Sequence, residues 1–326
     1  MDSLGEVRYL ARADVERLNV PMKEIIRIVE DVFREKAAGR TEVPPKPGVH
    51  PKKDCFIHAM PAYLETMKAA GVKWVSGFPD NPRNGLPYIS GLLVLNDTET
   101  GFPISVMDCT WITAKRTGAA TGVAAKHLAK EDSRVLGILG CGVQGRSNLE
   151  ALMVASKSLE RVKAYDTNDK NLQTYVKEMT ALHGISITPV ESPKKAVEGC
   201  DIVVTSGPIL KNPQPVIEKS WFTDGGLACP LDFDSYWKPE AIHSMHKFCT
   251  DDRDQLAYYR VQGYFSSLPD VYADMSEIVT GAKAGRESPK ERIMAMNLGL
   301  AIEDVATAFH VYQEAKKRNV GRMLPL

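Results

Sequence analysis

The spacing of apolar residues changes near residue 134 and divides the chain into two kinds of pattern. Residues 19–40 repeat apolar side chains at helical intervals, and Asn19 is placed to cap a helix there. A proline-rich loop follows at 41–54. Four strand-like runs come next, the last two flanking the turn sequence TETG: 55–64, 71–78, 88–97 and 102–108. This first part predicts one helix and a mainly antiparallel sheet.

Residues 110–129 join the two parts and are typical of a helix with unusually small side chains. Gly118, Ala119, Gly122 and Ala125 leave little bulk along it. Because only small residues let another backbone or a ligand come very close, we expect something to pack tightly against this helix.

Strands and helices alternate from residue 134 onward. Apolar runs of strand length are separated by helical stretches or loops: 134–139, 161–166, 185–190, 200–207, 223–230 and 246–252. Such alternation predicts a parallel sheet with helices on both faces. The last pattern, at 288–318, predicts one long helix that Ser288 caps, with Pro289 in its first turn.

The motif GCGVQG directly follows the apolar run RVLGIL. Gly140 permits the turn, Gly142 lets a backbone approach a pyrophosphate, and Gly145 lets helix and strand pack closely. The helix that follows offers free N–H groups and a partial positive charge to phosphates. Asp166 ends the next strand, where a carboxylate accepts hydrogen bonds from ribose hydroxyls and repels a 2′-phosphate. The pattern predicts a dinucleotide site that favours NAD over NADP, and its alternative is a tight turn without a ligand.

Composition narrows the class of protein. Lys and Arg total 41 among 326 residues, as do Asp and Glu, so no excess of basic charge indicates a nucleic acid or an anionic membrane as partner. No apolar run approaches the roughly 20 residues of a membrane span. The six cysteines form no CxxC pair and the seven histidines form no HExxH motif. This pattern favours reduced thiols in the cytoplasm and gives no indication of a metal site.

Three cations precede the glycine turn in informative places. Lys46 lies in the proline-rich loop, Lys73 inside an apolar strand, and Arg116 on the helix of small residues. Lys73 taken alone is also compatible with a solvated strand face, and Arg116 with a surface charge. The occurrence of these cations together favours a binding site for a carboxylate, because an arginine beside small residues is well placed to bind a carboxylate through two parallel hydrogen bonds.

The chain resembles the ornithine cyclodeaminase/mu-crystallin family in five motifs, which occur in the family's order: MPAYL, GVKWV, TETGFPISVMDCTWITAKRTGAATGVAAKHLA, GILGCGVQGRS and AMNLGLAIEDVATAFHVYQEAKKR. The resemblance implies an α/β fold in which a Rossmann NAD-binding domain, residues 131–288, is inserted in an α+β substrate-binding and dimerisation domain. That second domain would comprise residues 1–130 and 289–326. The resemblance also implies a homodimer formed through the sheet of the second domain.

The same resemblance implies roles for individual residues. Lys73 and Arg116 match the residues that hold the substrate carboxylate. Lys46 is the nearest match to a further arginine, and as a point charge it cannot form the planar fork. Asn297 matches a position near cofactor and substrate, and Tyr88 stands where a small hydroxyl residue near the nicotinamide is usual. The residues expected to contact the cofactor are Tyr88, Arg116, Thr117, Gly140, Gly142, Val143, Gln144, Gly145, Asp166, Thr205 and Ser206.

The catalytic acid is less directly indicated. In the cyclodeaminases an aspartate follows a glycine pair, and aligning this chain by its own glycines places Leu227 there. Alignment by spacing from Arg116 places Asp232 there instead, with Asp234 as second choice. We prefer Asp232, because a carboxylate at the carboxyl end of a strand lies where the nicotinamide is expected.

The resemblance also implies NAD-dependent oxidation or reduction at the C–N bond of a small amino acid or its imine, and we take this as the working hypothesis. The carboxylate would be fixed by Arg116, Lys73 and Lys46, and Lys73 and Asp232 would take part in catalysis. The glycine and lysine usual after the cyclodeaminase aspartate are absent from FDSYW. A cyclodeaminase that recycles its NAD internally, and a non-catalytic NAD(P)H-binding protein of the crystallin type, are the alternatives.

Overall fold

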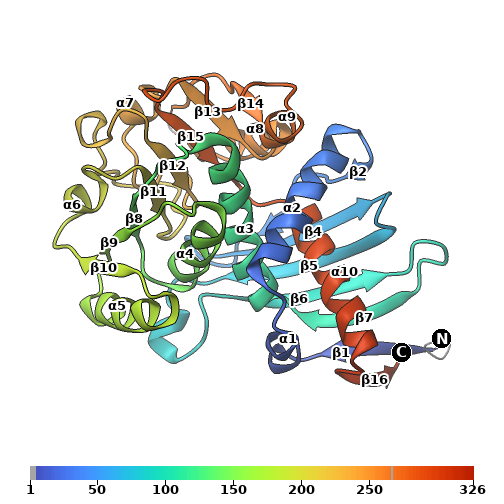
Figure 1. The fold of residues 1–326 in the computed structure, drawn as a ribbon. Helices are drawn as coiled ribbons and strands as arrows, with labels where there is room; N and C mark the ends of the chain where they lie inside the picture. Colours follow the sequence, from blue (N-terminus) through green and yellow to red (C-terminus); the bar gives the residue numbers. More distant parts are fainter. Residues whose placement is uncertain (1–4, 266) are drawn as a thin grey trace. The chain divides into compact units, whose positions relative to one another are not determined.

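The computed structural model describes residues 5–265 and 267–326, which form two compact units. Unit 1 consists of the chain up to Arg116 together with Leu300–Leu326, and unit 2 is Thr117–Gly299. Each unit has its own sheet (Figure 1).

The sheet of unit 1 is mainly antiparallel, as the sequence predicts. Its strands follow the order β16-β1-β7-β6-β5-β4-β2, with β3 beside β4, and only β1 and β7 among the described strands of this sheet pair in parallel. The strands are β1 Glu6–Leu10, β2 Thr41–Glu42, β3 Gly48–Val49, β4 Phe56–Leu64, β5 Ala69–Gly77, β6 Ile89–Asn96, β7 Pro103–Asp108 and β16 Arg322–Pro325.

One helix covers the middle of this sheet. α10, Ala301–Lys317, packs on β4, β5 and β6, and α2, Met22–Ala37, packs against α10 (Figure 1). The shorter α1, Arg12–Leu18, contacts both α10 and β7. The helix at 19–40 is confirmed, but its expected cap is wrong. Asn19 ends α1 instead, with a left-handed backbone that asparagine tolerates and that an N-cap residue does not have. The residue before α2 is Pro21, whose backbone is extended.

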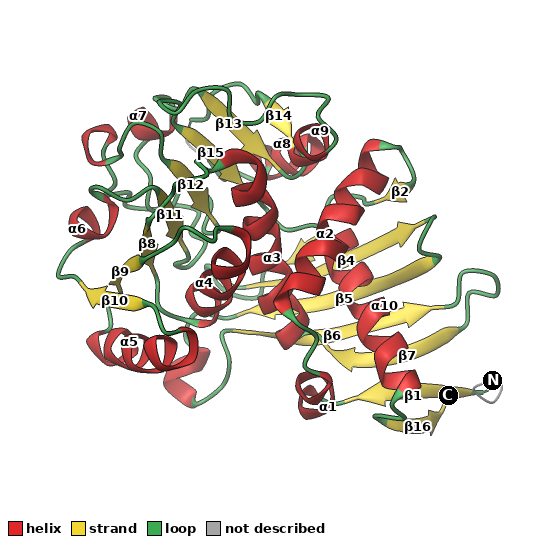
Figure 2. Cartoon of the chain, in the orientation of Figure 1, coloured by secondary structure: helices red, strands yellow, loops and turns green. Residues whose placement is uncertain are grey.

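The sheet of unit 2 is parallel throughout its described pairs, in the order β10-β9-β8-β11-β12-β15-β13-β14 (Figure 2). Its strands are β8 Val135–Leu139, β9 Arg161–Tyr165, β10 Ser186–Pro189, β11 Ile202–Thr205, β12 Leu227–Pro230, β13 Lys247–Thr250, β14 Ala273–Asp274 and β15 Ile293–Met296. Its helices are the C-terminal part of α3 Thr110–Leu128, and α4 Val143–Ala155, α5 Asp169–His183, α6 Pro193–Val197, α7 Pro239–Ile242, α8 Arg253–Val261 and α9 Met275–Val279. The predicted α/β alternation is confirmed.

The prediction of one long helix over 288–318 is wrong. Ile293–Met296 instead forms β15, which is buried between β12 and β13, and the helix begins only at Ala301. A short apolar run suits a buried strand as well as a helix, and here Gly299, with φ +81, lies between the two elements.

The limits of the units differ from those expected at 130 and 289. The small-residue half of α3 belongs to unit 2, where Gly118 lies so close to α4 that a Cβ atom would be 2.5 Å from the carbonyl oxygen of Ser147. This contact is the tight packing that the small residues predict. β15 likewise belongs to the parallel sheet, so the division moves to Arg116 and Leu300. In the described ranges, no helix has both the length and the hydropathy of a membrane span.

Candidate active site

The parallel strands of unit 2 bring several predicted site residues to one edge. Because all their pairings are parallel, the carboxyl ends of neighbouring strands share an edge of the sheet. The glycine turn follows β8, Asp166 follows β9, Thr205 ends β11, Asp232 comes two residues after β12, and Asn297 follows β15. The structure thereby gathers residues that are far apart in sequence at the edge where α/β proteins bind ligands.

The glycine turn has the geometry that its motif predicts. Gly140 has φ +99, and its N–H donates to the carbonyl oxygen of Tyr165 at 2.9 Å. A Cβ atom on Gly145 would collide with the carbonyl oxygen of Gly140, so only glycine lets α4 start this close to the strand. Beside Gly142, by contrast, a Cβ atom would meet no atom within 4 Å, and the next residue, Val143, is 59% exposed.

Asp166 is held beside this turn. Its Oδ2 accepts from the N–H of Cys141 and its Oδ1 from the N–H of Asn168, both at 2.8 Å. The first turn of α4 carries no acidic residue. Open space at Gly142, the N-terminal end of a helix and a fixed carboxylate together fit the pyrophosphate and ribose of a dinucleotide.

Asp232 is fully buried and tied to the end of β11. Its Oδ1 accepts from the hydroxyl of Thr205 at 2.7 Å, and its Oδ2 accepts from the N–H of Gly207 at 2.7 Å. Burial raises the pKa of Asp232 to about 7, against the lowering effect of those two hydrogen bonds, and the charge of Asp234 acts in the same direction as burial. A carboxyl group with this pKa can take up or release a proton near neutral pH.

Residues 205–207 connect the acid with the glycine turn. Thr205 and Gly207 bind Asp232, while the hydroxyl of Ser206 between them donates to the carbonyl oxygen of Gly140 at 2.9 Å. The ring of Tyr236 lies over Gly207, where a Cβ atom would be 2.6 Å from the ring. Burial raises the pKa of Tyr236, and the charge of Asp232 adds to that effect.

Unit 1 brings together two of the predicted cations. Nζ of Lys73 lies 2.6 Å from Oδ2 of Asp304, and Nε of Arg116 lies 2.9 Å from Oδ1 of the same carboxylate. Nη1 of Arg116 binds Oε2 of Glu303 at 3.0 Å. Lys73 is 1% exposed and Arg116 is also buried, so the solvated alternatives for both residues are wrong. We call these four side chains the charge cluster.

The charge cluster influences the acid–base behaviour of its cations. Burial lowers the pKa of Lys73, and Arg116 adds to this, while Asp304 opposes it. Burial also works against the charge of Arg116, but the attraction of Asp304 and Glu303 outweighs it and raises its pKa. The two acids stand in the first turn of α10, where the helix dipole favours negative charge.

Lys46 and His58 are buried in the same unit. Burial, then the charge of Lys46, then His50 and Lys73 lower the pKa of His58 to about 3. His58 is therefore a neutral ring near neutral pH, close enough to both lysines to be affected by their charges.

The remaining predicted residues occupy varied surroundings. Asn297 is buried, and among the described residues its Oδ1 has no hydrogen-bond partner; the same holds for Oε1 of Gln144. Tyr88 precedes β6 in unit 1, and its carbonyl oxygen accepts from the N–H of Phe78. Thr117 is half-buried in α3.

Three residues of the site were not predicted from the sequence, although two features of the sequence pointed to them. Glu303 and Asp304 stand in the apolar stretch GLAIEDVATAF, where two adjacent acids at a helix start indicate buried partners. His58 alternates with Met60, Ala62 and Leu64, so it belongs to the buried face of β4.

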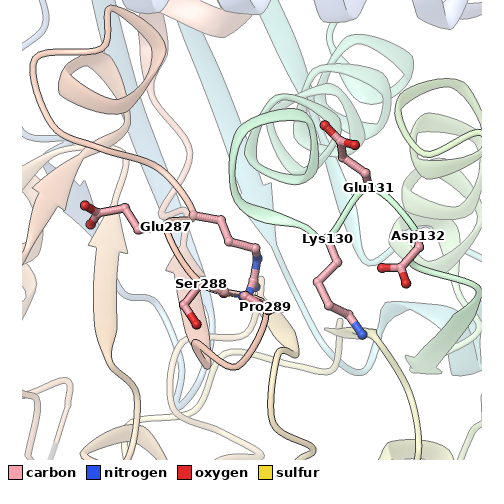
Figure 3. A pocket seen from close by; sticks show the side chains of 7 residues that line it. Lys130, Glu131, Asp132, Glu287, Ser288 and Pro289 are labelled. Atoms are coloured by element: carbon pink, nitrogen blue, oxygen red, sulfur yellow. Dashed lines mark hydrogen bonds between the residues drawn. The ribbon is translucent and has the colours of Figure 1, made fainter.

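A hollow in unit 2 lies among Lys130, Glu131, Asp132 and residues 286–289 (Figure 3). Its cations are already bound within the protein. Arg286 donates to the carbonyl oxygens of Leu128 and Glu291, and Nζ of Lys130 lies 2.8 Å from Asp201. It shares no residue with the predicted site. In the described ranges, no group of three or more His, Cys, Asp or Glu side chains is arranged to hold a metal ion.

Comparison with known proteins supports the family resemblance seen in the sequence. The model of the ornithine cyclodeaminase/mu-crystallin family matches residues 6–319. The chain belongs to this family. It is 38% identical to an alanine dehydrogenase of Archaeoglobus fulgidus over 324 residues, 97% of each chain.

Two solved structures of this family's fold are close. A Δ1-pyrroline-2-carboxylate reductase of Thermococcus litoralis, in complex with NADH and L-proline, has a TM-score of 0.88 at 35% identity and covers 97% of this chain and 99% of its own. An archaeal alanine dehydrogenase dimer with bound NAD has a TM-score of 0.87 at 36% identity, covering 98% and 99%.

Proposed function

We propose that the chain is an NAD-dependent oxidoreductase that acts on the C–N bond of a small amino acid or its imine. The observation that carries the proposal is the chain of contacts along residues 205–207, which ties a buried carboxyl of pKa about 7 to a dinucleotide turn. The alanine dehydrogenase and pyrroline-2-carboxylate reductase relatives support the substrate class.

Unit 2 would hold the cofactor. The N–H groups at the start of α4 would bind the pyrophosphate beside Gly142, and Asp166 would accept hydrogen bonds from the ribose. When bound, NAD supplies a nicotinamide that accepts or returns a hydride. Val143, being exposed at the first position of α4, would pack against the nucleotide.

Unit 1 would hold the substrate carboxylate. Arg116 uses Nε for Asp304 and Nη1 for Glu303, and in the described part of the chain Nη2 makes no hydrogen bond. Nη2 is thus the nitrogen with which Arg116 would meet a substrate, with Lys73 and Lys46 adding positive charge. Fixing the carboxylate orients the Cα–H bond for transfer, so binding energy is used for alignment.

Asp232 would move the proton. In the oxidative direction its ionised form takes a proton from the substrate amine or from attacking water. In the reductive direction its protonated form returns one. A pKa of about 7 makes both forms available near neutral pH.

We also propose a homodimer in the cytoplasm. Trp74 and Leu92 pair across β5 and β6 and are 50% and 45% exposed, and the archaeal alanine dehydrogenase neighbour is a dimer. The six cysteines are buried and free, which suits a reducing compartment.

A coupled assay tests the proposal. The protein is incubated with NAD and a panel of amino acids, and with NADH and cyclic imines or 2-oxo acids plus ammonia. We expect a net change in nicotinamide absorbance, which Asp232→Asn abolishes while NADH binding persists. Release of ammonia without that change indicates a cyclodeaminase. NADH binding without turnover on every panel indicates a non-catalytic binding protein.

A further inference from the structure

The turn that carries Asp232 contains an unusual backbone. Phe233 has φ +61 although it is not glycine, and its side chain is 2% exposed. The turn closes with a hydrogen bond from the N–H of Ser235 to the carbonyl oxygen of Asp232 at 3.1 Å. A left-handed backbone is unfavourable for a bulky residue, and it persists only where the surroundings hold it.

The surroundings that hold Phe233 are aromatic. Its ring centroid lies 5.0 Å from that of Tyr259 in α8, 5.5 Å from Tyr264 and 5.0 Å from Phe265, the contact with Tyr264 being edge-on. Tyr259 and Tyr264 also contact each other edge-on, at 5.4 Å. We call Tyr259, Tyr264 and Phe265 the ring cage. Such arrangements add to the free energy gained by burying the ring.

Asp232 is therefore fixed from two sides. Its carboxylate is bound by Thr205 and Gly207, and the N–H of Leu231 before it donates to the carbonyl oxygen of Thr205 at 2.9 Å. The next residue, Phe233, anchors the turn in the ring cage. A glycine at 233 would adopt the same φ without strain but would have no ring to anchor.

We propose that Phe233 is a positioning residue for the reaction. Its ring, held in the ring cage, keeps the carboxyl group of Asp232 dry and aimed at the bond that reacts. The inference rests on the proposed function, because it assigns Asp232 the proton transfer.

The charges around Asp232 make this role measurable. Asp234 on the same turn and Tyr236 beyond it are the titratable neighbours, and Thr205 and the N–H of Gly207 face the carboxylate from the end of β11. Burial is the largest cause of the raised pKa of Asp232. If the anchor is lost and water enters, burial weakens while the hydrogen bonds remain, so the pKa falls.

The experiment compares Phe233→Gly, Phe233→Leu and a control, Phe248→Leu. Phe248 is also 2% exposed and lies in β13 within the same hydrophobic core. We expect Phe233→Gly to lower the pKa in the pH profile of kcat by about one unit. We also expect it to lower kcat by about tenfold or more, with NADH affinity unchanged. Phe233→Leu, which keeps an apolar anchor, should retain most of the wild-type profile.

The control separates positioning from stability. Phe248→Leu should lower the melting temperature without moving the kinetic pKa. If Phe233→Gly moves that pKa no further than the control does, the inference is overturned. Should Phe233→Gly fail to fold, Phe265→Leu reduces the ring cage without changing the turn, and it must shift the pKa in the same direction.

Failure of the proposed function would look different. If the wild type shows no turnover, the pKa of Asp232 is obtained from the pH dependence of unfolding in wild type and Asp232→Asn. A pKa of about 7 that falls in Phe233→Gly would support the positioning of Asp232 even though the reaction was misassigned, and an unchanged value would refute it.

Discussion

Replacement of Asp304 by asparagine should destabilise the protein more than replacement of either cation that it binds. Asp304 is buried and accepts from Nζ of Lys73 at 2.6 Å and from Nε of Arg116 at 2.9 Å. Asp304→Asn removes the negative charge from both contacts at once. Lys73→Met leaves Asp304 with Arg116, and a mutation of Arg116 leaves Asp304 with Lys73.

The magnitude follows from the distances. At an effective dielectric constant near 20, unit charges 2.6 Å apart attract each other by about 6 kcal/mol. Much of this is offset by the cost of removing the two groups from water, so loss of one partner costs about 3–5 kcal/mol. We expect Asp304→Asn near the upper end of that range. For Lys73→Met we expect about 3 kcal/mol, the lower end of the range, because Asp304 then keeps Arg116 as a partner.

Calorimetry and denaturant unfolding of the two single variants and the double variant test this reasoning. The double variant should lose less unfolding free energy than the sum of the two single variants, because each single substitution already removes the interaction between Lys73 and Asp304. The control is the ion pair of Lys68 and Glu99, 3.4 Å apart and 71% and 74% exposed, which should contribute about 0–1 kcal/mol. Equal costs for Asp304→Asn and for loss of this exposed pair would refute the reasoning.

The remaining predictions concern the reaction, the cofactor and assembly. Under the proposed function oxidative turnover would need ionised Asp232, so its kcat should rise with pH and level off above about 7, while the kcat of reductive turnover should fall. A profile that is flat between pH 5 and 9 would contradict the assignment. Between pH 3.8 and about 7 the carboxyl group of Asp232 is protonated in the folded protein and ionised in the unfolded chain, so stability falls as the pH rises through that window. Asp232→Asn should therefore raise the melting temperature at pH 8 but not below pH 4. Asp166→Asn should narrow the preference for NAD over NADP, measured as the ratio of the two kcat/KM values, and an unchanged ratio would remove Asp166 from the ribose site. Trp74→Glu should give monomers in light scattering with the fold retained in circular dichroism, whereas persistent dimers would place the interface elsewhere.

Unit 2 was accessible from sequence because its signals are local. Strand, turn and helix follow one another within a few residues, and Gly140 and Gly145 are required by contacts inside a single turn. The exception is β15, since Ser288 and Pro289 form a helix-start pattern before a run of apolar residues whose neighbours in the sheet are β12 and β13.

Only the two cations of the charge cluster could be predicted from the sequence, for two physical reasons. Period-two alternation separates the faces of β5 without stating which face is buried, and Val72 and Trp74 made the wrong face look apolar. The carboxylate partner of Lys73 is 231 residues away in sequence, so no local pattern joins them. Cations were therefore predicted without the acids that keep them charged.

The two acids explain how the cations of the charge cluster can be buried. Two buried cations alone would be costly, and Glu303 and Asp304 make the four side chains formally neutral. The acids are supplied by the first turn of α10, after the whole of unit 2 has passed along the chain. Unit 1 can therefore bury Lys73 and Arg116 only once the segment after Leu300 has returned to its sheet. Under the proposed function, a substrate carboxylate would join cations that are already oriented, and its binding free energy would not be needed to hold them in place.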